Sequence, residues 1–208
     1  MGQTSINTTH KPTKTLWSAL ANDSAIKVWM ADLGRVVAQG KDWGLAGQAV
    51  VIEADDEEVV KELIQHVAEA AGIQLHQFAA NGVLEEFPDW CDGLAAPEPS
   101  MVYLSAGSWQ GAKFAELNAD ALPSTHDQDK CNEFIVALKE VIETKLSLLP
   151  VVLVTTVKSF EQLNISLREA GMFDRRIQMP KLSDAAVFGA FAEEVGIENL
   201  DDSITSQM

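Results

Sequence analysis

The sequence predicts an α/β fold with a five-stranded, mostly parallel sheet and helices on both faces. Three observations indicate it. Short apolar stretches of strand length alternate with longer segments whose apolar residues recur every three or four positions. The stretch Pro150 to Thr156 is apolar nearly throughout, as is typical of a strand in the middle of a parallel sheet. No segment repeats another, which favours one domain built from strand–helix units.

The predicted elements are bounded by glycines, prolines and polar residues. In chain order they are a helix from Asp23 or Ser24 to Gly40, a strand at 49–53, a helix ending at Gly72, a strand candidate at 73–80, a mixed loop and short-helix region at 81–100, a strand at 101–106, a long loop at 107–128, a helix at 132–149, a strand at 150–156, a short helix at 161–171, a strand at 175–180 and an amphipathic helix at 183–196. We expect residues 1–15 to be a flexible arm, 16–196 one domain and 197–208 a polar tail.

The charge of the chain excludes several classes of partner. Lys and Arg total 15 against 31 Asp and Glu, so the formal net charge is −16. A chain this acidic is not expected to bind nucleic acid through phosphate attraction, and it should repel anionic membrane surfaces. No apolar run approaches the roughly 20 residues of a membrane span, and the polar start is not a signal peptide. We therefore expect a cytoplasmic protein.

The cysteines and histidines give no metal-binding pattern. Cys91 and Cys131 have no close Cys or His neighbours, so we expect two buried thiols in a reducing compartment, although the sequence leaves a disulfide open. The four histidines lack ligand spacing. We expect no cofactor and no metal site.

The segment Leu167–Ile177, LREAGMFDRRI, resembles the second region of homology of AAA ATPases. In that family an apolar strand ending in Thr-Thr-Asn leads to a short helix, then to Gly-Arg-Phe-Asp-Arg and a short strand ending in proline. The resemblance extends back over residues 44–195. It implies an AAA+-like P-loop NTPase core, and the short chain after Gly196 implies that the family's helical lid subdomain is lacking.

The family's phosphate loop departs most from its pattern here. A Walker A loop needs glycines that expose backbone N–H groups, a lysine for the phosphates and a hydroxyl for magnesium. At the matching place the chain has a run of acids, Glu53, Asp55, Asp56, Glu57 and Glu58. The family's lysine and hydroxyl positions fall near Val59 and Val60. These acids suit the start of a helix but repel a triphosphate, so the resemblance implies a degenerate phosphate loop.

Two other parts of the ATPase machinery depart from the family as well. Where the family has the Walker B Asp-Glu pair, the chain has Ser105 and Ala106, and the polar residue that ends the fourth strand is replaced by Val157. Serine is not a base at neutral pH. We therefore assign no catalytic residue and lean against enzymatic activity.

The family's two arginine fingers fall at Met172 and Arg175. We weigh two interpretations of Arg175: a structural ion pair or cap with Asp174 at the edge of a strand, or an arginine that acts on a neighbouring subunit. Arg176 lies beside it. Asp174, Arg175 and Arg176 are thus our candidate interface residues.

Three functions remain open. The first is a non-catalytic AAA ATPase-like domain that works through protein–protein contact, with a true AAA ATPase or with itself. The second is a divergent ATP-binding protein in which Lys61 or Lys41 reaches the phosphates. The third is an acidic antagonist of a basic partner protein, suggested by the net charge.

Overall fold

The computed structural model describes residues 23–78, 83–93, 98–105 and 125–179. The chain divides into two compact units, Ala25–Met179 and a second made of Met1–Ser24 with Pro180–Met208. Nearly all of the second unit lies outside the described residues. The predicted arm, last helix and tail lie outside them too, and the expected lack of a lid subdomain stays a prediction. The predicted domain boundaries stay predictions, and the fold below concerns 25–179.

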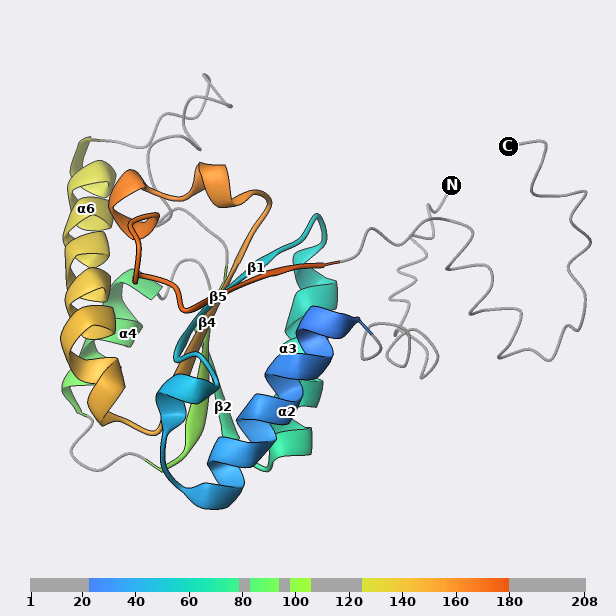
Figure 1. Cartoon of the computed structure of the whole chain (residues 1–208). Helices are drawn as coiled ribbons and strands as arrows, with labels where there is room; N and C mark the ends of the chain where they lie inside the picture. Colours follow the sequence, from blue (N-terminus) through green and yellow to red (C-terminus); the bar gives the residue numbers. More distant parts are fainter. Residues whose placement is uncertain (1–22, 79–82, 94–97, 106–124, 180–208) are drawn as a thin grey trace, which may run out of the picture. The chain divides into compact units, whose positions relative to one another are not determined.

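A five-stranded parallel sheet forms the centre of this unit (Figure 1), which confirms the predicted fold class. The strands lie side by side in the order β2-β3-β4-β1-β5. Every residue of β1, β3 and β4 is buried, because these three strands are flanked on both edges and covered on both faces. The strands are β1 (Ala49–Glu53), β2 (Gln74–Phe78), β3 (Ser100–Leu104), β4 (Val151–Val157) and β5 (Arg175–Gln178).

Helices cover both faces of the sheet. Figure 1 shows α2 (Ser24–Gln39) and α3 (Glu57–Ala71) on one side, and α4 (Val83–Asp92) and α6 (Thr125–Glu140) on the other. The handedness of βαβ units explains the division. The chain crosses the sheet in one direction from β1 to β2 and in the opposite direction from β2 to β4, so the connecting helices take opposite faces.

Helices α2 and α3 follow the predicted bounds. Each buries one apolar stripe and is followed by a glycine with a positive φ, +66° at Gly40 and +68° at Gly72. Glycine suits that left-handed conformation because it has no Cβ. The buried stripe of α3 consists of Val60, Leu63, Ile64, Val67 and Ala68.

Two predicted segments differ from the structure. Helix α6 begins at Thr125 rather than at 132, because its first turns are polar and carry no apolar stripe to predict them. It continues into a π-helical turn, η3 (Val141–Lys145), and a 3-10 turn, η4 (Leu146–Leu148). The predicted helix at 161–171 is instead two 3-10 turns, η5 (Phe160–Gln162) and η6 (Ile165–Leu167), because Asn164 adopts an extended ψ of 140° and caps a new turn with its side chain.

The carboxyl ends of β1 and β4 lie next to each other, and the chain leaves these two strands toward opposite faces of the sheet. After β1 it continues into α3, and after β4 into η5 and η6, of which η6 packs beside α6. In open parallel sheets, ligands bind at such a switch point. The residues that follow β1 are therefore the place to look for a site.

Candidate functional site

The acidic residues after β1 do not form one cluster. Four of the carboxylates have contacts: Asp56 and Glu58 bond within the first turns of α3, Glu57 bonds to the end of β3, and Glu53 bonds to β5 and η5. Asp55 and Glu58 are exposed, whereas Glu53 is buried. The sequence-predicted degenerate phosphate loop is thus dispersed over the strand end, the loop and the first turn of α3, and its members are considered one at a time.

Asp56 is the N-cap of α3. Its backbone is extended, and its Oδ1 accepts N–H bonds from Glu58 at 2.9 Å and from Val59 at 3.4 Å. These are two of the backbone N–H groups at a helix start that have no carbonyl partner within the helix. A phosphate bound at a helix N-terminus uses the same groups. In this chain they already donate to a carboxylate.

Glu57 is half-buried in the first turn of α3. Its Oε1 accepts hydrogen bonds from the Ser105 hydroxyl at 2.5 Å and the Tyr103 hydroxyl at 3.1 Å. The Tyr103 hydroxyl also lies 2.8 Å from Thr156 Oγ1. Burial raises the pKa of the Tyr103 phenol, with the neighbouring Glu57 charge acting in the same direction. The carboxylate of Glu57 therefore joins the end of β3 to the start of α3, and the Tyr103 hydroxyl joins β3 to Thr156 of β4.

Glu53 is the last residue of β1. Its carboxylate is buried, forms a 2.5 Å ion pair with Arg176 Nε and accepts the Phe160 N–H at 3.1 Å. The Arg176 guanidinium also lies over the Phe160 ring, 4.6 Å from its centroid. Glu53 thus holds η5 and β5 against the end of β1.

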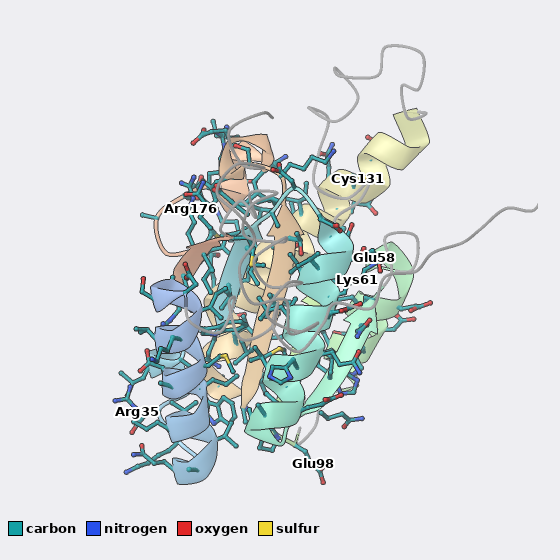
Figure 2. All side chains as sticks on the ribbon, turned by 90° about the vertical axis from the view of Figure 1, so that its right-hand side faces the viewer. Arg35, Glu58, Lys61, Glu98, Cys131 and Arg176 are labelled. Atoms are coloured by element: carbon teal, nitrogen blue, oxygen red, sulfur yellow. The ribbon has the colours of Figure 1, made fainter. Side chains whose placement is uncertain are left out.

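Lys61, one of the two lysines considered for a divergent phosphate site, is paired with a glutamate. Figure 2 shows Lys61 and Glu58 at the same end of α3, and Lys61 Nζ lies 2.7 Å from Glu58 Oε1. This hydrogen bond is the main reason that the pKa of Lys61 is raised, with burial acting against it and the charges of Glu57 and Glu58 adding to it. The pair lies one turn apart on the surface of α3.

The candidate interface arginines make contacts within the chain. Arg175 pairs with Asp32 of α2 and donates to the Leu45 carbonyl at 2.9 Å. Its side chain lies so close to Gly47 that a Cβ there would come within 2.8 Å of it. Arg176 pairs with Glu53, although about half of its side chain remains exposed. Both arginines join β5 to neighbouring elements.

Asp174 caps the first residues of β1. Its Oδ2 accepts the N–H groups of Gln48 at 2.8 Å and of Ala49 at 3.0 Å. The predicted cap at a strand edge is therefore present at Asp174. The partner of Arg175 is Asp32 of α2, not the adjacent Asp174.

The sequence analysis assigns no site role to Tyr103 or Thr156. Each lies one residue before the end of a parallel strand, and neighbouring strands end at the same edge of a sheet. That pattern could have predicted that Tyr103 and Thr156 meet at the edge where α3 begins.

The described part of the chain has neither a group of metal-ligand side chains nor a helix that could span a membrane. In residues 23–78, 83–93, 98–105 and 125–179, no three His, Cys, Asp or Glu side chains are grouped so that they could hold a metal ion. Within the same ranges, no helix has both the length and the apolar character that crossing a membrane requires. Cys91 and Cys131, both among the described residues, are buried and form no disulfide.

Comparison with known proteins supports the fold. The sequence matches no protein-family model and no curated protein. Among solved structures, it is similar to a single-substitution form of RuvB from Thermotoga maritima, with a TM-score of 0.54 and 14% identity. The match covers 89% of this chain and 55% of the RuvB chain, so this chain spans about half of that length. RuvB is an AAA+ ATPase, and the shared parallel five-stranded core gives this chain an AAA+, P-loop NTPase-like fold.

Proposed function

We propose that this chain is a non-catalytic AAA ATPase-like domain that acts through contact with another protein. One observation carries the proposal: carboxylates of the chain itself occupy the groups that would otherwise bind a phosphate. Asp56 takes two N–H groups of α3, and Glu57 takes the hydroxyls of Tyr103 and Ser105 at the end of β3.

Electrostatics favours an empty nucleotide site. A triphosphate at the start of α3 would lie beside the carboxylates of Asp56 and Glu57. Two unit charges of the same sign 4 Å apart repel by about 4 kcal/mol at an effective dielectric constant of 20. The dipole at a helix N-terminus stabilises a nearby anion by only about 0.3–1 kcal/mol. The repulsion therefore outweighs the attraction.

The position of the missing Walker B acids supports the same conclusion. Ser105 lies there, and its hydroxyl donates to Glu57. A serine hydroxyl does not take a proton from an attacking water at neutral pH.

The partner is a protein, either a true AAA ATPase or a second copy of the chain. Arg175 and Arg176 stay candidates for that contact, but each already holds β5 in place. Replacing either one therefore changes stability as well as binding. Any interface test on them needs a stability measurement beside it.

The experiment is isothermal titration with ATP and ADP, each with and without magnesium, beside a nucleotide-binding AAA protein as positive control. We expect no heat of binding and no thermal shift at millimolar nucleotide. Binding at 100 times the dissociation constant would stabilise the chain by about 2.7 kcal/mol. A saturable heat that disappears in Lys61→Ala would instead establish the divergent ATP-binding site and refute the proposal.

A further inference from the structure

Strand β2 forms one end of the described sheet. It pairs with β3 on one side, and no described strand pairs with it on the other. The side chains of Gln74 and Gln77 in this strand are exposed. A strand in this position presents backbone N–H and C=O groups to which another extended chain can bind.

The pairing with β3 identifies the backbone groups on the open edge of β2. The Phe78 carbonyl accepts the N–H of Ser105 at 3.1 Å. Every second residue of a parallel strand directs its N–H and C=O to the same neighbour, so Phe78 and every second residue before it bond to β3. The N–H and C=O groups of Leu75 and Gln77 therefore point to the open edge.

The two edges of the sheet differ in their protection against association. Edge strands commonly carry a charged side chain, a proline or a bulge that prevents further pairing. Strand β2, with the sequence QLHQF, has no Asp, Glu, Lys, Arg or Pro, and its register with β3 is continuous. Strand β5, at the opposite edge, contains Arg175 and Arg176, which form ion pairs with neighbouring elements. Of the two edges, β2 is the one suited to accept a further strand.

The helices beside β2 are acidic. Helix α3 lies on one face of the sheet and α4 on the other (Figure 1), and both contact β2. Each contains four Asp or Glu residues, and the only Lys or Arg in either helix is Lys61, which pairs with Glu58. On α4, Glu86 and Asp89 are exposed. A strand added to β2 would therefore lie between two negatively charged helices.

Two aromatic rings lie on the α4 face of β2. The ring centroids of His76 and Trp90 are 5.0 Å apart, and both side chains are partly exposed. Burial lowers the pKa of His76, so its ring is neutral at pH 7. An indole ring attracts the cationic end of a lysine or arginine side chain. The carboxylates and the indole ring therefore favour the same kind of ligand.

We propose that the open edge of β2 binds an extended, basic segment of a partner protein. The segment extends the sheet by one strand, through hydrogen bonds with the backbone groups of Leu75 and Gln77. Its side chains alternate between the two faces, where lysines or arginines meet the acids of α3 and α4. A second copy of the chain fits this edge poorly, because twofold pairing of β2 would bring the acidic helices of both copies together.

This inference deepens the proposed function and rests on its statement that the chain acts through contact with another protein. It does not involve the start of α3 where a nucleotide would bind. The two can therefore fail separately. A chain that binds no basic segment at β2 leaves the result of the nucleotide titration unchanged, and a chain that binds ATP can still bind a peptide at this edge.

The test begins with a display library of random peptides of about 12 residues, twice the usual length of a strand. The full chain is the target. We expect the enriched peptides to contain more Lys and Arg than the library, separated by β-branched or aromatic residues. The tightest peptide is then labelled with fluorescein and titrated by fluorescence anisotropy.

Gln77→Pro tests the backbone contact. Proline removes an N–H that does not bond to β3, and edge strands tolerate it. We expect this variant to raise the dissociation constant of the peptide at least about tenfold. Gln77→Thr is the matched control, because it retains the N–H and should bind like the unsubstituted chain. Circular dichroism and urea denaturation show that both variants are folded.

Replacement of acids on α4 tests the charge. Glu86→Gln and Asp89→Gln should each raise the dissociation constant by about twofold to fivefold, the effect of an exposed ion pair. Glu133→Gln removes the same charge from α6 and should leave binding unchanged.

Three results overturn the proposal. The first is a set of enriched peptides with no excess of Lys and Arg, and the second is a peptide that binds Gln77→Pro as tightly as the unsubstituted chain. The third comes from sedimentation equilibrium without peptide. A dimer of the unsubstituted chain that Gln77→Pro abolishes would assign the edge of β2 to a second copy instead.

Discussion

The ion pair between Arg176 and Glu53, at the end of β1, shows how a single residue can affect the stability of the fold. Glu53 is buried at the end of β1, and Arg176 supplies its only described counter-charge while covering the Phe160 ring. When a buried carboxylate loses its partner, the free-energy cost of its removal from water remains and is no longer offset by the ion pair. Arg176 itself is half exposed, so solvent reduces the effect below that of a fully buried pair.

We expect Arg176→Ala to lower the free energy of unfolding by about 2 kcal/mol, between the values for exposed and buried pairs. Arg35→Ala is the control, since the Arg35–Asp32 pair is largely on the surface and its loss should change stability by less than about 0.5 kcal/mol. Urea denaturation of both variants gives the comparison. Equal losses would mean that Glu53 does not depend on Arg176.

Cys91 gives a pH-dependent prediction. Burial raises the pKa of its thiol from 9.0 to about 11, with Lys145 opposing and Asp92 reinforcing the shift. Above pH 9 the unfolded chain loses this proton and the folded chain keeps it, so stability falls as the pH rises. By pH 11 the loss reaches about 2–3 kcal/mol.

Urea unfolding under reducing conditions at pH 8, 9.5 and 10.5 measures the slope, and the same series on Cys91→Ala is the comparison. The variant should be less stable at pH 8 but lose less between pH 8 and 10.5. Tyr103, whose pKa is also raised by burial, contributes in the same direction in both proteins above its ordinary pKa of 10.0. Parallel slopes in the two proteins would contradict the prediction.

At the scale of elements, the sequence predicts best where one local signal suffices. Helix α3 has an apolar stripe and a terminal Gly72, and the structure confirms both. Of the four acids that suit the start of this helix, the structure shows Asp56 as the cap. The start of α6 and the 3-10 turns after β4 lack such signals. The contacts of Glu57 with Tyr103 and Ser105 join residues about 46–48 positions apart, and no local pattern reports a distance of that kind.

Gly34 inside α2 and Gly72 after α3 allow a test of how backbone conformation affects stability. Gly72 has a φ of +68° after α3, whereas Gly34 lies inside α2 with open space around it. We expect Gly72→Ala to destabilise the chain by about 1 kcal/mol, because alanine resists that φ. Gly34→Ala should stabilise it by about 0.5–1 kcal/mol. Thermal unfolding should show a lower Tm for Gly72→Ala and a higher Tm for Gly34→Ala. Tm shifts of the same sign would refute the positive φ as the reason for Gly72.

At the scale of the whole molecule, the net charge of −16 opposes compaction. Salt shortens the range of this repulsion, to about 8 Å at physiological ionic strength. We expect the Tm to rise by about 2–4 °C, or about 1 kcal/mol, between 10 and 150 mM NaCl. Tetramethylammonium chloride should act equally if screening is the cause. A Tm that falls with salt, or a response only to sodium, would contradict this explanation.

The strand order affects how the chain folds while it is being synthesised. Ala49 of β1 pairs with Leu153 of β4, and Val50 pairs with Arg175 of β5, so the two neighbours of the first strand are synthesised about 104 and 125 residues after it. At about 5–20 residues per second, a ribosome needs roughly 5–25 seconds to produce them. Throughout that interval the apolar residues Val50, Val51 and Ile52 lack their sheet partners on the nascent chain. Translation speed and nascent-chain chaperones should therefore govern the yield of soluble protein.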